Sequence, residues 1–164
     1  MCRAAKAINT ELKQYSLIDC TFIKNKIYMY PEYMVAPMRE ELTSVGFEEL
    51  KTADSVEKAL MADGTVLVMV NSVCGCAAAN ARPAARMAVK NEKRPDKIVT
   101  VFAGMDQDAV SKARSMMLPY PPSSPSIALF KDGKVVHMIE RHHIEGRPAQ
   151  MIAENLVAAF EEYC

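Results

Sequence analysis

The chain of 164 residues has no tryptophan and no apolar run long enough to span a membrane. Its 20 basic and 20 acidic residues balance, and no basic block or interleaving of aromatic residues with arginine occurs. These absences argue against nucleic acid or an anionic membrane as a partner. The first residues also lack the apolar core of a secretory signal, so we expect a cytoplasmic protein.

Cysteine is scarce, with five residues at positions Cys2, Cys20, Cys74, Cys76 and Cys164. An odd, unevenly spaced set does not fit a secreted disulfide scaffold. In a reducing compartment it indicates that some cysteines are catalytic or bind metal, while the rest are ordinary thiols. We interpret Cys2 and Cys20 as incidental.

Residues 1–28 have no clear hydrophobic periodicity, and an organised pattern begins directly after Met29, which could be an alternative start. We therefore predict an N-terminal extension over residues 1–28 and one domain over residues 29–164. The length suits a single domain with one proper core.

The domain alternates helical and strand patterns. A capping-box spacing of Asp54 and Glu57 starts one helix, and Pro83 is expected to bend another. The order predicts an α/β fold of the thioredoxin-like type, with a mixed central sheet, helices on both faces, and a C-terminal antiparallel hairpin plus helix. The predicted strands are residues 47–50, 65–70, 97–103, 126–130 and 135–139, and the predicted helices begin near residues 31, 54, 74, 106 and 148.

An apolar, β-branched strand over residues 65–70 ends shortly before Cys74, Gly75 and Cys76, where a helical pattern begins. The free N–H groups at a helix start favour a thiolate, so Cys74 is the candidate nucleophile. Cys76, expected to be the more buried sulfur, is the candidate resolving thiol. Gly75 would supply the backbone freedom that a small, strained and therefore oxidising disulfide ring needs.

The order of elements is similar to the thioredoxin fold, in which reactive cysteines follow a central strand and a cis-proline precedes the final hairpin. Ser124 and Pro125 stand at the matching position, where backbone groups can pair with a substrate strand. One departure is that the strand before Cys74 carries no carboxylate and no tryptophan precedes the cysteine. Proton transfer must then involve another group or water.

A closer resemblance is to the bacilliredoxin family, and it extends from about Tyr30 to the end of the chain. The terminal Cys164 is part of it. The most specific segment is Val70-Asn-Ser-Val-Cys-Gly-Cys-Ala-Ala. The others are Met38-Arg-Glu-Glu-Leu, Gly46-Phe-Glu-Glu-Leu, Ala81-Arg-Pro-Ala, Val99-Thr-Val-Phe-Ala-Gly, Pro122-Ser-Ser-Pro-Ser, Arg141-His and Ile144-Glu-Gly.

This resemblance implies that the partners are S-bacillithiolated client proteins and bacillithiol, a low-molecular-weight thiol. Cys74 would attack the bacillithiol sulfur, and either Cys76 or a second thiol would resolve the adduct. Thiol exchange needs no metal and no organic cofactor.

Several other residues are candidate contacts for the substrate. Asn71 and Ser72 are expected to form the strand-to-helix turn before the cysteines, where Asn71 could also contact substrate. His142 and His143 follow the hairpin on a loop that can approach the active edge, where one of them could shuttle protons or contact bacillithiol. Arg82 and Arg86 are candidates for binding the carboxylates of bacillithiol.

Three alternatives remain open at this point. A protein disulfide isomerase would use the same first attack on a different disulfide. A metal or iron-sulfur carrier would use the Cys-x-Cys pair with histidines elsewhere as ligands. A non-enzymatic interaction module would not use the thiols at all.

Overall fold

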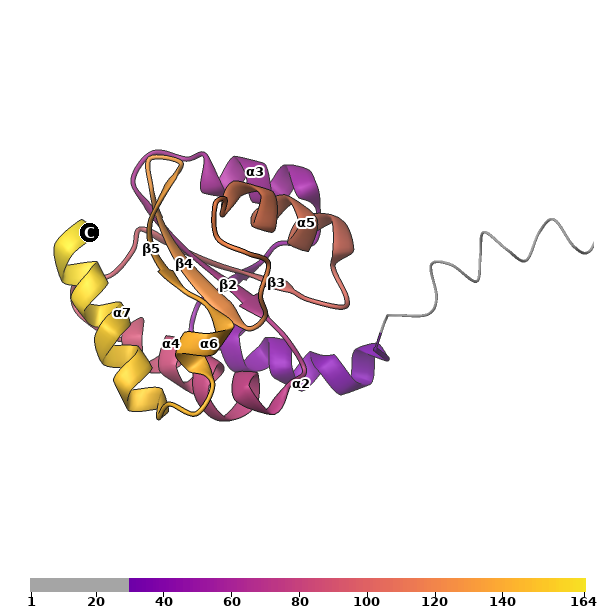
Figure 1. Ribbon diagram of the computed structural model, residues 1–164. Coiled ribbons are helices and arrows are strands. Elements are labelled where there is room, and N and C mark those ends of the chain that lie inside the picture. The colour runs from indigo at the N-terminus through magenta and orange to yellow at the C-terminus, as the bar shows by residue number, and fades with distance from the viewer. Residues whose placement is uncertain (1–29) are drawn as a thin grey trace, which may run out of the picture.

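The computed structural model describes residues 30–164 (Figure 1). The predicted extension, with Cys2 and Cys20, and Met29 lie outside the described residues. The helices are α2 (Glu32–Thr43), α3 (Ala53–Leu60), η1 (Ala77–Ala81), α4 (Arg82–Ala88), α5 (Gln107–Met116), α6 (Arg141–Ile144) and α7 (Ala149–Tyr163). The strands are β1 (Glu48–Glu49), β2 (Thr65–Asn71), β3 (Lys97–Phe102), β4 (Ser126–Lys131) and β5 (Lys134–Ile139).

The five strands form one mixed sheet in the order β1-β3-β2-β4-β5. Strands β1, β3 and β2 are parallel, whereas β4 runs antiparallel to β2 and pairs with β5 as a hairpin. This confirms the predicted mixed sheet and C-terminal hairpin. All seven residues of β2 are buried, as expected for a central strand of β-branched and apolar residues covered on both faces.

Helices cover both faces of the sheet, with α3 and α5 on one side and α2, α4 and α7 on the other (Figure 1). Alternation along β2 supplies both cores, because successive side chains of a strand point to opposite faces. Leu67 and Met69 pack under α4 and α7, while Val66, Val68 and Val70 pack under α3 and α5.

Two local predictions for the first helices are wrong. Helix α3 is capped by Thr52, whose Oγ1 accepts a hydrogen bond from the Ser55 amide at 3.2 Å, so Asp54 lies inside the first turn instead. Thr52 is extended, and this directs its hydroxyl at the free amides. For α2, the sequence pattern predicts one apolar stripe of Met34, Val35, Met38, Leu42 and Val45. Met34 is 42% exposed, however, and the stripe misses Arg39, which is 7% exposed.

The disturbance expected at Pro83 takes the form of a π-helical turn. In η1 the Arg82 amide donates to the Ala77 carbonyl five residues earlier, and Pro83 follows in the first turn of α4. Proline has no N–H with which to continue the helical hydrogen bonds, and the change of hydrogen-bond spacing falls directly before it.

Candidate active site

The cysteine pair lies at the start of the helix after β2, at the carboxyl edge of the parallel strands. The Cys74 carbonyl accepts from the Ala77 and Ala78 amides at 3.1 and 3.2 Å, so Cys74 stands at the N-terminal end of the helical segment. Its Sγ also accepts from the Ala77 amide at 3.4 Å. The Sγ atoms of Cys74 and Cys76 are 2.6 Å apart, and both are free, partly exposed thiols.

Hydrogen bonds distinguish the two sulfurs electrostatically. Burial acts to raise the pKa of Cys74, but the Cys76 thiol, the Ser72 hydroxyl at 3.2 Å and the Ala77 amide stabilise its thiolate, and the net pKa is lowered. The pKa of Cys76 is raised, by burial and then by its bond to Cys74. At a pH between the two values, Cys74 carries the negative charge and Cys76 the proton.

One expectation about this motif differs from the structure, and the expectation for Gly75 concerns a disulfide that this thiol form does not contain. Cys76 packs against the core, but it is partly exposed like Cys74, so exposure alone does not separate the two thiols. Gly75 is not among the glycines with positive φ, and a Cβ built on it would meet nothing within 4 Å. With both thiols free, therefore, neither conformation nor space requires glycine at this position.

Asn71 and Arg82 hold the turn that carries the cysteines. The Asn71 Oδ1 accepts from the Ser72 amide at 2.8 Å and from Arg82 Nη1 at 3.2 Å. Arg82 also donates from Nη1 to the Ser72 carbonyl at 3.1 Å and from Nε to Glu41 at 2.9 Å. Asn71 is fully buried and Arg82 is 2% exposed. Both are positioning residues, so neither presents its side chain to a substrate as expected.

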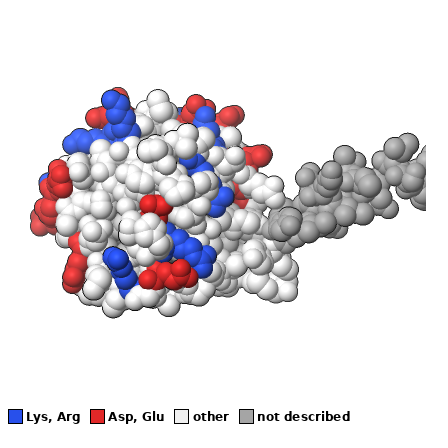
Figure 2. All heavy atoms as spheres, in the orientation of Figure 1, with Lys and Arg blue, Asp and Glu red and all other residues white. Residues whose placement is uncertain are grey.

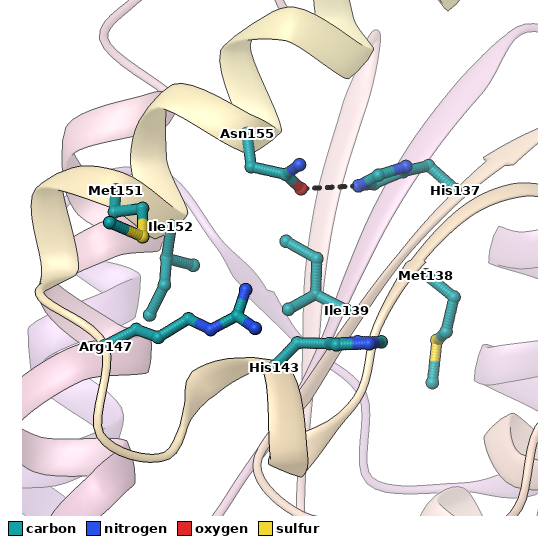
Figure 3. Close-up of a pocket in the computed structure, with 8 residues that line it drawn as sticks. All are labelled: His137, Met138, Ile139, His143, Arg147, Met151, Ile152 and Asn155. Atoms are coloured by element: carbon teal, nitrogen blue, oxygen red, sulfur yellow. Dashed lines mark hydrogen bonds between the residues drawn. The ribbon is translucent and has the colours of Figure 1, made fainter.

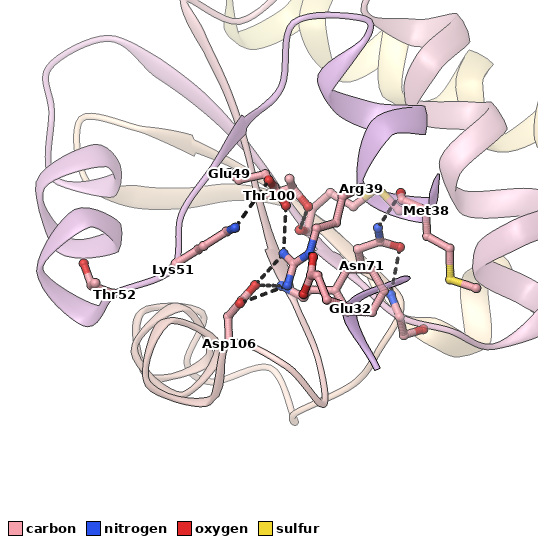
Figure 4. Close-up of polar contacts among 12 residues, drawn as sticks. Glu32, Met38, Arg39, Glu49, Lys51, Thr52, Asn71, Thr100 and Asp106 are labelled. Atoms are coloured by element: carbon pink, nitrogen blue, oxygen red, sulfur yellow. Dashed lines mark hydrogen bonds and ion pairs between the residues drawn. The ribbon is translucent and has the colours of Figure 1, made fainter. Parts of the chain in front are cut away.

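A second buried arginine joins α2 to the sheet beside this turn (Figure 4). Arg39 Nη1 donates to Glu49 at 2.7 Å and to Asp106 at 2.9 Å, and these carboxylates raise the pKa of Arg39 against the effect of burial. The preceding Met38 carbonyl accepts from Asn71 Nδ2 at 3.2 Å. This network was not predicted from the sequence. The available signal was Arg39, a charged residue within the apolar stripe of α2.

Ser124 lies near Cys74, since both line one cavity, and the peptide bond between Ser124 and Pro125 is cis, as expected. The Ser124 carbonyl accepts from Arg141 Nη1 at 3.2 Å. A cavity of about 360 Å³ opens beside Cys74, and we call it the cysteine hollow. Its lining includes Ser72, Val73, Cys74, Ser124, Arg114 and Arg141, together with Tyr30 and the turn after β3.

The two hollow-lining arginines were missed as site residues. Arg141 belongs to the Arg141-His segment of the family resemblance, but no role followed from that segment. Arg114 gave no signal, because it lies in the last turn of α5 among polar residues. Arg86, the other arginine proposed to bind carboxylates, is exposed on α4 and does not line the hollow.

His143 does not lie in the cysteine hollow. His142 and His143 belong to the helical turn α6, not to a loop, and His143 Nδ1 accepts from the Glu140 amide at 3.2 Å. His143 lines a separate cavity of about 270 Å³ between β5 and α7, where His137 Nε2 lies 2.8 Å from the Asn155 Oδ1 (Figure 3). Burial lowers the pKa of His143, and His142 beside it contributes.

Cys164 lies at the other end of the sheet. The Tyr163 carbonyl accepts from Lys131 Nζ at 2.8 Å, and Lys131 pairs with Thr65, the first residue of β2. Since the cysteine pair follows the last residue of β2, about 20 Å of strand separates the two ends. Cys164 is therefore out of reach of Cys74 within one chain.

A metal cluster built on the cysteines is not assembled within residues 30–164. In this part of the chain, one group of three side chains has metal-ligand spacing, Glu140 with His142 and His143, whose ligand atoms lie within 4.8 Å of one another. Neither Cys74 nor Cys76 belongs to it. The metal-carrier alternative thus has no third ligand beside the cysteines among these residues.

The described surface has mixed charge. Basic and acidic side chains are interspersed over the face shown in Figure 2. Among residues 30–164, no helix combines the length and the apolar character that crossing a membrane would take.

Solved structures share this fold. A protein with a thioredoxin fold matches 73% of this chain and 96% of its own at 17% identity, with a TM-score of 0.57. Mitochondrial thioredoxin 3 from Saccharomyces cerevisiae, in its oxidised form, matches 74% of this chain and 98% of its own at 13% identity, with a TM-score of 0.51. This protein is a thioredoxin-fold thiol-disulfide oxidoreductase. The class follows from the fold and the paired free thiols, together with the relatives described next.

The sequence matches are much closer. The family described as disulphide isomerase matches residues 30–164. A bacilliredoxin from Cytophaga hutchinsonii is 55% identical over 134 residues, which cover 82% of this chain and 99% of that protein. A bacilliredoxin from Bacillus cereus is 53% identical over 148 residues, 90% of this chain and 98% of that protein. The chain belongs to this family, the bacilliredoxins.

Proposed function

We propose that this oxidoreductase removes bacillithiol from S-bacillithiolated cysteines of client proteins, with Cys74 as nucleophile and Cys76 as resolving thiol. The observation that supports it most is the state of Cys74, a partly exposed sulfur with three hydrogen-bond partners that can all donate to its thiolate, and it opens onto the cysteine hollow. The names of the relatives support the choice of bacillithiol as the cap.

The first proposed step is one thiol-disulfide exchange. The Cys74 thiolate attacks the bacillithiol sulfur, and the disulfide between bacillithiol and the client breaks as the new one forms. The client leaves as a thiolate and takes a proton from water. The disulfide count is unchanged, so this step needs no external oxidant or reductant.

The second proposed step uses the neighbouring sulfur. Cys76 loses its proton as the charge on Cys74 disappears into the mixed disulfide, because that charge is one cause of its raised pKa. It then attacks Cys74, releases bacillithiol and leaves a Cys74–Cys76 disulfide. Reduced low-molecular-weight thiols would regenerate the pair, which is why the proposed compartment is the cytoplasm.

Ser124 and Pro125 are proposed to hold the client strand. They end the proline-rich segment 119–125, and Ser124 lines the hollow with Cys74, so backbone groups there can pair with an extended segment next to the capped cysteine. A direct contact of Asn71 or His143 with the substrate is not supported by their positions. The proposed unit of function is the predicted domain, residues 29–164.

The test uses a purified client protein carrying bacillithiol on one cysteine. Mass spectrometry should show loss of the cap with the wild-type protein, no loss with Cys74→Ala, and bacillithiol retained on Cys74 with Cys76→Ala. A cap that stays on with the wild-type protein, or leaves equally fast with Cys74→Ala, would refute the proposal.

Protein disulfide isomerisation is the second candidate, supported by the description of the matching family. It needs the same attack by Cys74 on a disulfide within one protein. Refolding of a scrambled disulfide protein by Cys76→Ala would favour it, since isomerisation does not require the resolving thiol.

A further inference from the structure

We infer that Arg114 and Arg141 form an anion-binding subsite beside Cys74, which selects small thiol caps that carry carboxylates. This inference deepens the proposed function and rests on it for the identity of the substrate. It replaces Arg82 and Arg86, which the sequence suggested for the same task.

The first argument is the charge of the cysteine hollow. Two arginines line it, and none of its lining residues is aspartate or glutamate. The remaining lining groups are neutral apart from the Cys74 sulfur itself. In a mixed disulfide that sulfur is no longer charged, so both guanidinium groups then face a space without a counter-charge.

The second argument is the unmet hydrogen bonding of Arg114. Its Nε is buried and has no hydrogen-bond partner among the described residues. Arg114 also makes no ion pair within residues 30–164, unlike the buried Arg39 and Arg82. Because Arg114 has no carboxylate partner in this part of the chain, its guanidinium group is free to pair with an anion that enters the hollow, and a carboxylate fits its planar donor geometry best.

The third argument is the fixed position of Arg141. Its Nη1 donates to the Ser124 carbonyl, and its Nη2 donates to Glu145 at 3.1 Å. The Glu145 pair is exposed on both sides, so solvent weakens its neutralising effect. Arg141 is thus joined to the Ser124 side of the hollow, and its positive charge acts to lower the pKa of both Cys74 and Cys76.

The size of the hollow limits what it can select. About 360 Å³ accommodates a small-molecule cap and not a folded partner. The two arginines come from α5 and α6 and line the same hollow, so a cap with more than one carboxylate can contact both. The class of ligand is therefore a low-molecular-weight thiol with one or more carboxylates.

The test that does not depend on cap removal compares two alkylating reagents. Iodoacetate and iodoacetamide react with the same sulfur by the same displacement, but only iodoacetate is anionic. The ratio of their rates at Cys74 is measured by peptide-resolved mass spectrometry and divided by the ratio for a free small thiol. We expect Arg114→Gln and Arg141→Gln each to lower this normalised ratio about fivefold. That is the effect expected from losing one hydrogen bond to a charged group when solvent weakens the bond.

Two further variants control for structure and net charge. Arg94→Gln removes one positive charge from an exposed residue outside the hollow and should leave the ratio unchanged. Arg114→Lys keeps the charge and should recover part of the ratio. Raising the salt concentration should slow iodoacetate selectively at Cys74 in the wild-type protein, because the interaction is between charges.

The same variants are then assayed on one client peptide capped with mercaptosuccinate or with 2-mercaptoethanol. The preference for the anionic cap should fall about fivefold in each arginine variant, for the same reason. If the removal rates of the anionic and the uncharged cap change in proportion, and the ratio of the two alkylation rates also stays at the wild-type value, the subsite is refuted. The proposed function is not affected by that result. If the wild-type protein removes no cap while the reagent ratio still falls in the variants, the subsite stands and the proposed function fails.

Discussion

Replacing Ser72 with alanine tests the idea that local hydrogen bonds make Cys74 the thiolate. The Ser72 hydroxyl lies 3.2 Å from Cys74 Sγ, and Ser72 is 7% exposed, so water cannot easily replace it. The substitution removes one of three donors to the sulfur and should raise the pKa of Cys74. The Cys76 and Ala77 donors remain, so the effect should be partial.

The magnitude follows from the strength of that one bond. A hydrogen bond to a charged group contributes about 1.5–3 kcal/mol, and partial exposure of the sulfur reduces this to about 1 kcal/mol. That energy changes the thiolate population about fivefold at a pH below the pKa. A more basic thiolate is also about twofold more nucleophilic, with a Brønsted coefficient of about 0.4–0.5, so the net rate should fall about two- to threefold.

The assay is the rate of exchange with a small uncharged disulfide reagent across a pH series, followed on the Cys74 peptide by mass spectrometry. The Cys76→Ser background prevents resolution and retains a hydroxyl donor beside Cys74. Ser115→Ala is the matched control, because the Ser115 hydroxyl donates to the Lys112 carbonyl at an exposed position of α5.

The two pH limits should respond in opposite directions. Below the pKa of Cys74, Ser72→Ala should react more slowly than its parent. Well above that pKa, Cys74 is ionised in both proteins, and the variant should react slightly faster because its thiolate is more basic. A pH profile that coincides with that of the parent, or is displaced to lower pH, would refute the hydrogen-bond account. Equal slowing at every pH would indicate a change of accessibility instead.

Three other predictions concern residues around the site. Arg82→Gln should lower the free energy of unfolding by about 2–3 kcal/mol in denaturant titrations, because the substitution leaves buried acceptors without a donor. Arg86 is exposed, so Arg86→Gln should change this free energy by less than about 0.5 kcal/mol. Cys164→Ser should leave the exchange rate at Cys74 unchanged, and a slower rate would contradict the placement of Cys164 at the far end of β2. Hydrogen bonds from Thr65 lower the pKa of Asp96, so Asp96 stabilises the fold at neutral pH and this contribution is lost as the pH falls through its lowered value. The stability difference between wild type and Asp96→Asn should therefore shrink below about pH 4, and a difference that is independent of pH would contradict this.

The fold could be predicted from the sequence because its signals are local. The uninterrupted apolar run of residues 65–70 identified the central strand, and the alternation of strand and helix patterns indicated a covered sheet with a closing hairpin. The position of Cys74 at the start of a helix also followed from neighbours in the chain, whereas the cis-proline position at Pro125 came from the resemblance to the thioredoxin fold. Boundaries and caps were less certain, as the Thr52 cap shows, since several hydroxyl and carboxyl groups compete for the same free amides.

The surroundings of the cysteines depended on the tertiary structure. The sequence offered Arg82 and Asn71 as possible substrate contacts and favoured a turn role for Asn71, but only the packed structure shows that both side chains hold the Cys74 turn from inside. Arg114 and Arg141 are remote from the cysteines in sequence, and only the folded chain brings them to one hollow. The sequence by itself determined where the reactive sulfurs sit, because strand and helix starts depend on nearby residues. The packing of elements that are distant in sequence decided which charged residues lie near those sulfurs. Hydrophobic periodicity along the chain does not predict such packing.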